Sequence, residues 1–92
     1  MNELQQAHIF YAGKVQGIGF RYTAKSFAKE LGLTGWVKNL NDGRVELVIE
    51  GDVSKLEQLQ KMLMDQFGIY IVNADVRLQK AQGKFQDFSV VS

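Results

Sequence analysis

The chain has 92 residues, 46% of them apolar, and contains neither cysteine nor proline, which fits one globular domain over residues 1–92 with a single modest core. The lack of cysteine excludes disulfide bonds, thiolate metal sites and cysteine nucleophiles, and it suits a cytoplasmic protein. The net charge of +1 is too small to indicate a nucleic-acid-binding protein, and no apolar run approaches the length of a membrane span, so we expect neither partner.

The first predicted element is a strand at residues 7–13, "AHIFYAG", whose aromatic and β-branched residues favour extended structure. A glycine-rich loop follows, and apolar residues then recur at helical spacing from Ala24 to Leu31, which predicts a helix over residues 21–32. Gly32 stands where a left-handed C-terminal cap is expected. Residues 33–40 predict a second strand, and "NDG" at residues 41–43 predicts a hairpin turn.

The second half of the chain continues with residues 44–51, "RVELVIEG", which alternate between apolar and polar as a half-buried strand does. Asp52 can cap a helix whose apolar stripe runs from Val53 to Phe67, and residues 69–78 and 85–92 predict two further strands. The order β-α-β-β-α-β, with two helix stripes that need one sheet face, predicts an α+β, ferredoxin-like sandwich. We expect a four-stranded antiparallel sheet covered on one face by both helices, and residues 85–92 could add a short extra edge strand.

The loop at residues 13–21, "GKVQGIGFR", leads into a helix N-terminus, where the first N–H groups have no partner within the helix. Gly17 and Gly19 allow a sharp backbone turn, successive N–H groups can form an anion nest, and Arg21 can grip oxyanions with two nitrogen atoms. The segment matches neither the P-loop nor the dinucleotide fingerprint. Its spacing alone supports equally a phosphate-binding loop and a glycine-rich turn with an arginine facing solvent.

Few side chains could perform catalysis on a bound phosphate. His8 is the only histidine and lies within a predicted strand, Asp42 belongs to a turn, and no carboxylates have metal-ligand spacing. The leaving group must therefore depart without a proton donor, as a carboxylate can, because the pKa of its acid is about 4. This favours the mixed anhydride of a carboxylic acid and phosphoric acid, with Arg21 neutralising charge and a neutral amide such as Asn39 orienting water. The alternative is that Asn39 is a strand-end residue without such a role.

Two segments resemble the signatures of the acylphosphatase family. Residues 13–21 are similar to G-x-V-Q-G-V-x-F-R, with Ile18 in place of valine, and residues 35–51, "GWVKNLNDGRVELVIEG", are similar to the second signature. The resemblance implies an enzyme that needs no metal or other cofactor and hydrolyses acyl phosphates to a carboxylate and inorganic phosphate. It implies that Arg21 binds the phosphate, that Asn39 orients the water, and that a loop cradles the phosphate through the backbone of Val15, Gln16, Gly17, Ile18, Gly19 and Phe20.

On this basis we expect a cytoplasmic monomer that binds a small acyl phosphate, and phosphate or sulfate as product or mimic. The resemblance weakens after residue 64, where the chain lacks the glycine-proline-proline turn of many family members. Two alternatives remain. One is a non-catalytic ferredoxin-like module that binds phosphate or acyl phosphate, which sequence does not separate from a slow enzyme. The other is an RNA-binding domain, which places aromatic residues on its central strands, whereas residues 44–51 contain none.

Overall fold

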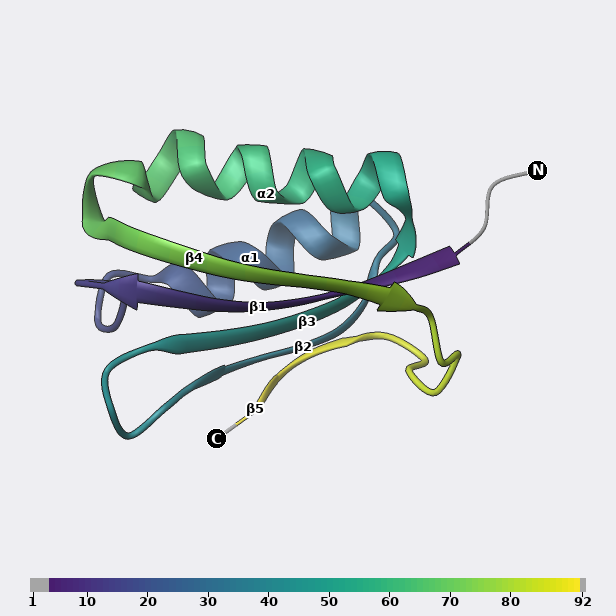
Figure 1. The fold of residues 1–92 in the computed structure, drawn as a ribbon, viewed down its shortest axis with the longest axis horizontal. Helices are drawn as coiled ribbons and strands as arrows, with labels where there is room; N and C mark the ends of the chain where they lie inside the picture. The colour runs from purple at the N-terminus through teal and green to yellow at the C-terminus, as the bar shows by residue number, and fades with distance from the viewer. Residues whose placement is uncertain (1–3, 92) are drawn as a thin grey trace.

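The computed structural model describes residues 4–91, which fold into a β-sheet and two α-helices (Figure 1). The strands are β1 (Leu4–Gly13), β2 (Thr34–Asn39), β3 (Val45–Asp52), β4 (Ile71–Lys80) and β5 (Phe88–Val91). The helices are α1 (Phe20–Glu30) and α2 (Val53–Phe67), and a 3₁₀ turn, η1 (Gly68–Tyr70), follows α2. Within residues 4–91, neither α-helix has the length and apolar character needed to span a bilayer.

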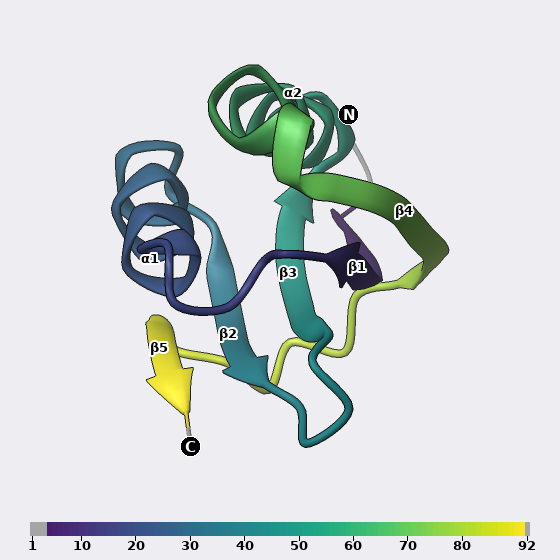
Figure 2. The same ribbon diagram turned by 90° about the vertical axis from the view of Figure 1, so that its left-hand side faces the viewer.

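The sheet has the strand order β4-β1-β3-β2-β5, which confirms the predicted ferredoxin-like arrangement and its extra edge strand. Neighbouring strands are antiparallel except β2 and β5, which run parallel. The four main strands are antiparallel, as predicted, and the parallel edge strand β5 makes the five-stranded sheet mixed. The cause is the connection at residues 81–87, which crosses the sheet beside the start of β2, where the N–H of Gly35 donates to the carbonyl of Asp87 (3.0 Å). From that end, β5 can only run in the direction of β2 (Figure 2).

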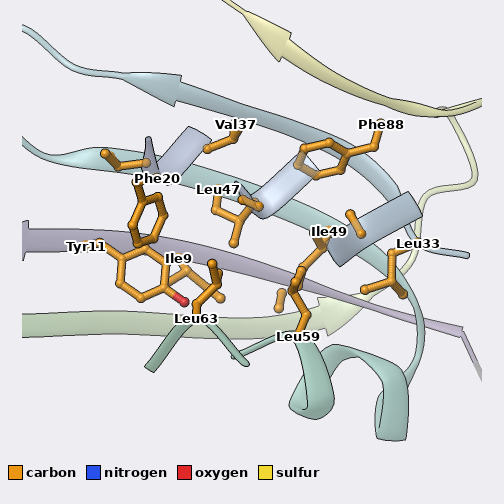
Figure 3. Packing of buried hydrophobic residues seen from close by; sticks show 14 of the residues in the cluster. Ile9, Tyr11, Phe20, Leu33, Val37, Leu47, Ile49, Leu59, Leu63 and Phe88 are labelled. Carbon is orange, nitrogen blue, oxygen red and sulfur yellow. The ribbon is translucent and has the colours of Figure 1, made fainter. Parts of the chain in front are cut away.

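Both helices cover one face of the sheet. Helix α1 packs against β2 and β5, and α2 packs against β3 and β1. Alternate strand residues face the helices and are at most 1% exposed: Ala7, Ile9, Tyr11, Val45, Leu47 and Ile49. They meet Leu59 and Leu63 of the predicted stripe on α2 (Figure 3). Val53 does not belong to this stripe, because it starts the helix and is 37% exposed.

The ends of the two helices differ in how their backbone groups are satisfied. The Asp52 carboxylate accepts from the N–H of Ser54 (3.1 Å), which confirms the predicted cap of α2. The predicted C-terminal cap of α1 is also present, since Gly32 has φ 71° and the N–H of Leu33 donates to the carbonyl of Ala28 (2.8 Å). The N-terminus of α1 has no side-chain cap, because its N-cap residue is Gly19.

Strand β4 covers Ile71–Lys80, close to the predicted range of residues 69–78. Strand β4 pairs with β1 in a register that places Val76 opposite Ile9 and Leu78 opposite Ala7. It lies at an edge of the sheet, so only one of its two sides is paired in this arrangement. Val76 and Leu78 point to the helix side, as their partners do, and yet are 40% and 62% exposed. Strand β4 is therefore the least buried of the strands.

Candidate active site

The two segments singled out in the sequence meet at one end of the sheet. Residues 14–19 leave the end of β1, pass in front of β3 and β2, and enter α1 (Figure 2). At the same end, β2 finishes at Asn39 and turns into β3. A cavity of about 190 Å³ lies between the two segments and is lined by Val15, Gly17, Gly19, Phe20, Arg21, Tyr22 and Asn39. Arg21 and Asn39, which are far apart in sequence, thus share one cavity.

Apolar side chains anchor the loop on both sides of its glycines. Val15 and Phe20 are 1% and 2% exposed, and Ile18 packs against the core. The Phe20 ring packs against Tyr11 of β1, as Figure 3 shows, with a centroid distance of 5.0 Å. Its centroid is also 5.0 Å from that of Phe67 of α2. Burying one such ring stabilises the fold by about 2 kcal/mol. These anchors hold the loop backbone at the surface of the core.

The backbone between these anchors presents N–H groups without partners. Gly17 and Gly19 have φ values of 78° and 83°, a conformation that favours glycine. Within residues 4–91, no backbone carbonyl accepts from the N–H groups of residues 15–20, and the first bond of α1 runs from the N–H of Thr23 to the carbonyl of Gly19 (3.1 Å). A Cβ added at Gly17 or Gly19 would meet nothing within 4 Å, so the space above the loop is open. This backbone is suited to bind an anion.

Arg21 adds a full positive charge to this end of the sheet. It lies in the first turn of α1, is half-buried and lines the cavity. Its guanidinium lies over the Tyr22 ring, with Cζ 5.8 Å from the ring centroid. In the described part of the chain it forms no ion pair with a carboxylate. The charge is therefore available to an anion in the cavity.

Asn39 contributes an acceptor on the other side of the cavity. It is the last residue of β2 and pairs with Val45 of β3. Its Oδ1 is buried and has no hydrogen-bond partner among residues 4–91. Leaving a buried acceptor unpaired costs about 1–3 kcal/mol, so this atom calls for an explanation beyond folding. Asn39 as a residue lines the cavity, which makes its amide a candidate to contact a group bound there.

Two residues at the site were not assigned a side-chain role from sequence. The side chain of Gln16 turns away from the cavity, and its Nε2 donates to the carbonyls of Leu40 (2.8 Å) and Arg44 (3.0 Å). These partners are backbone atoms 24 and 28 positions away, and no sequence pattern marks them. Tyr22 lines the cavity and is 64% exposed. The only sequence feature that could have placed Tyr22 at the cavity is its position directly after Arg21.

Other polar residues lie outside the cavity, as the sequence indicated. His8 is a strand residue whose Nε2 is 2.6 Å from Oε2 of Glu46 on the face without helices. Asp42 serves the hairpin turn, where it accepts from the N–H of Arg44 (3.0 Å), and this bond holds the pKa of Asp42 below its usual value. A larger cavity of about 360 Å³, lined by residues that include Leu33, Glu50 and Phe85, contains none of the predicted site residues.

Comparison with known proteins agrees with these features. The family model for acylphosphatase matches residues 7–90. An acylphosphatase of Roseiflexus sp. is 40% identical over 92 residues, covering 99% of both chains, and one of Methylococcus capsulatus is 42% identical over 89 residues, covering 96% of this chain and 97% of the other. The crystal structure of acylphosphatase from Bacillus subtilis superposes with a TM-score of 0.87 at 31% identity, covering 96% of this chain and 99% of the other. The resemblance noted in the sequence is confirmed: this chain belongs to the acylphosphatase family.

Proposed function

We propose that the cavity at Arg21 and Asn39 is the active site of an acylphosphatase and that it holds the phosphoryl group of an acyl phosphate. One observation carries this proposal. One cavity is lined by residues of the loop whose N–H groups are unpaired, by an arginine without a carboxylate partner and by Asn39, whose buried side-chain oxygen is unpaired. The first two suit an anion, and the third suits a molecule that donates a hydrogen bond.

In the proposed reaction, a water molecule attacks phosphorus in line with the bond to the acyl oxygen. Oδ1 of Asn39 accepts a hydrogen bond from this water and fixes its direction of attack. The new bond forms between the water oxygen and phosphorus as the phosphorus–acyl oxygen bond breaks, and the carboxylate leaves with the bonding pair. The water proton passes to the phosphate product or to solvent. Asn39 stays neutral throughout and acts by orientation.

Arg21 and the N–H groups of residues 15–20 stabilise the charge on the phosphoryl oxygens. A preorganised donor of this kind lowers the barrier by about 3 kcal/mol. The lining residues provide no carboxylate, imidazole or thiol, so an alkoxide leaving group would meet none of these general acids in the cavity. We therefore expect acyl phosphates to be hydrolysed without a metal ion and simple alkyl phosphates to be left intact. Inorganic phosphate or sulfate should compete for the same donors.

The test is the hydrolysis of benzoyl phosphate in the presence of EDTA, with inorganic phosphate as a competitive inhibitor. Arg21→Ala should abolish both turnover and phosphate inhibition. Asn39→Ala should lower kcat by about 10²-fold or more while the Ki of phosphate changes little. Arg77→Ala is the matched control, because Arg77 is 72% exposed on β4. Loss of activity with EDTA would contradict the metal-free mechanism, and a full rate for Asn39→Ala would remove this residue from it.

The same assay decides between an enzyme and a non-catalytic module. A phosphate-binding module would bind phosphate through Arg21 and leave benzoyl phosphate intact. We further propose that the protein acts as a monomer. The absence of cysteine supports the expected cytoplasmic location.

A further inference from the structure

The two halves of the site are joined by one side chain, that of Gln16. Both hydrogens of its amide are used, one on the carbonyl of Leu40 (2.8 Å) and one on the carbonyl of Arg44 (3.0 Å). The same two residues close the hairpin turn, since the N–H of Leu40 donates to the carbonyl of Arg44 (2.8 Å). The N–H of Gly43 donates to the carbonyl of Leu40 (3.2 Å). The amide of Gln16 therefore bridges the two residues, Leu40 and Arg44, at which the turn after Asn39 begins and ends.

The location of these carbonyls connects Gln16 to Asn39. The N–H of Leu40 belongs to the peptide unit that follows the Asn39 Cα, and it donates to the same Arg44 carbonyl that Gln16 holds, so Gln16 restrains this unit through Arg44. Oδ1 of Asn39 has no hydrogen bond of its own in the described part of the chain, so its position depends on the backbone that carries it. Among residues 4–91, the two Gln16 bonds are the hydrogen bonds that link the loop at 14–19 to the turn at 40–44.

The anchoring of the loop makes Gln16 stiff enough to transmit this restraint. Val15, directly before Gln16, is 1% exposed in the core, and Gln16 itself is half-buried. The phosphate donors lie on the same loop, so one short segment carries both the N–H groups and the bridge to the turn. The Gln16 amide thus connects the loop that carries these N–H groups to the turn that follows Asn39.

We infer that Gln16 is a positioning residue, whose amide holds the strand end bearing Asn39 at the separation from the phosphate-binding loop that in-line attack by water requires. The inference rests on the function proposed above for Arg21 and Asn39. If the inference is correct, loss of the bridge should affect kcat but leave the affinity for phosphate nearly unchanged. Phosphate binding uses the loop and Arg21, which remain when the bridge is lost. Turnover also needs the water in line, and a displacement of about 1 Å in such a geometry can lower a rate by about 10²-fold.

The experiment removes the bridge in two ways. Gln16→Leu keeps the approximate size but donates no hydrogen bond, and Gln16→Glu keeps the shape but turns a carboxylate toward two carbonyl oxygens. For both, we expect kcat for benzoyl phosphate to fall by about 10- to 100-fold, with the Ki of inorganic phosphate within about twofold of wild type. Gln60→Leu is the matched control, because Gln60 also donates from Nε2 to a backbone carbonyl, that of Leu56 (3.2 Å), within α2. It should leave both constants unchanged.

A double-mutant cycle with Asn39→Ala tests whether Gln16 acts through Asn39. In the Asn39→Ala background, Gln16→Leu should change kcat by less than about twofold, because the oxygen that it positions is gone. Circular dichroism checks that each variant is folded, and Gln16→Asn, which keeps the amide on a shorter side chain, replaces any variant that is not.

Three results would overturn the inference: a wild-type kcat for the Gln16 variants, an equal loss of kcat with and without Asn39, or a loss of phosphate affinity as large as the loss of kcat. The failure of the proposed function looks different. If Asn39→Ala kept the wild-type rate, the water-orienting role would fail and the inference would fail with it. A slow Asn39→Ala variant beside a wild-type rate for Gln16→Leu would overturn the inference alone.

Discussion

Replacing Glu50 should destabilise the protein without changing its activity. Glu50 lies on β3 and is 5% exposed. Its carboxylate accepts three hydrogen bonds, from Nε2 of Gln6 (2.7 Å) and from the N–H groups of Gln82 (2.9 Å) and Gly83 (3.0 Å). Gln6 also accepts from Nε2 of Gln79, which extends the network to β4. Glu50 thereby fastens the connection at residues 81–87 across the sheet, far from the cavity at Arg21 and Asn39.

The expected loss of stability depends on how many hydrogen-bond donors each variant leaves unpaired. In Glu50→Gln one carboxylate oxygen becomes an NH₂ group, so at least one of the three N–H donors faces another donor, at a cost of about 1–2 kcal/mol. Glu50→Ala removes all three bonds. Gln82 and Gly83 are exposed and can turn to water, but Gln6 is 4% exposed and keeps an unpaired amide, so we expect a loss of about 3 kcal/mol. For a domain of this size, about 2 kcal/mol corresponds to roughly 10 °C in Tm.

The contribution of Glu50 should also depend on pH. Burial raises the pKa of Glu50, but its three hydrogen-bond donors together outweigh burial and bring that pKa below its usual value. A carboxylate with a depressed pKa in the folded state stabilises the fold above its unfolded pKa, about 4.3 for Glu. This stabilisation is lost as the pH falls through the folded pKa. The difference in stability between wild type and Glu50→Gln should therefore shrink below about pH 4.

The assay is urea unfolding at pH values from 7 down to 3, together with kcat for benzoyl phosphate at pH 7. Glu57→Gln, an exposed position on α2, removes the same charge and should change the stability by less than about 0.5 kcal/mol. The reasoning would be refuted if Glu50→Gln unfolded at the wild-type urea concentration at pH 7. It would also be refuted if the difference between the two proteins stayed constant down to pH 3.

Three further predictions concern the loop, the cavity mouth and the sheet. Gly19→Ala and Gly32→Ala introduce a side chain at similar φ values, 83° and 71°, so urea unfolding should show a loss of about 1 kcal/mol for each, but only Gly19→Ala should lower kcat. Tyr22→Ala should raise KM for benzoyl phosphate more than for acetyl phosphate, because this ring lines the cavity mouth; equal changes would contradict acyl contact. Gly35→Ala places a Cβ 1.9 Å from the carbonyl oxygen of Val48, and circular dichroism should show an unfolded or strongly destabilised protein.

The elements of the fold could be predicted because their signals are local. The strand alternation at residues 44–51, the stripe from Leu56 to Phe67 and the caps at Gly32 and Asp52 each depend on neighbours within one turn or one strand. The parallel pairing of β5 could not be predicted in this way. A strand of four residues carries little pattern, and its position depends on the route of residues 81–87. That route is held by Glu50 bonds over 32 and 33 positions.

The candidate site also has a part that the sequence could predict and a part that depends on long-range contacts. The glycine loop, Arg21 and Asn39 were identified because they belong to two segments that resemble the signatures of the acylphosphatase family, and the structure places Val15, Gly17, Gly19 and Phe20 beside them around one cavity. Their roles in catalysis stay predictions. The side chain of Gln16 escaped sequence reasoning because its partners are carbonyl oxygens, which every residue possesses. Only the folded hairpin shows that two of them converge on one amide.

The position of β1 in the strand order also has a consequence for backbone dynamics. Strand β1 is paired on both sides, whereas β4 is paired on one. Hydrogen–deuterium exchange should therefore alternate along residues 71–80, fast at amides that point outward and slow at those that point to β1, while the amides of β1 exchange slowly throughout. The loop at residues 14–19 starts where β1 ends. It is thus attached to a segment that opens rarely, and its free N–H groups can exchange with solvent while their positions stay fixed.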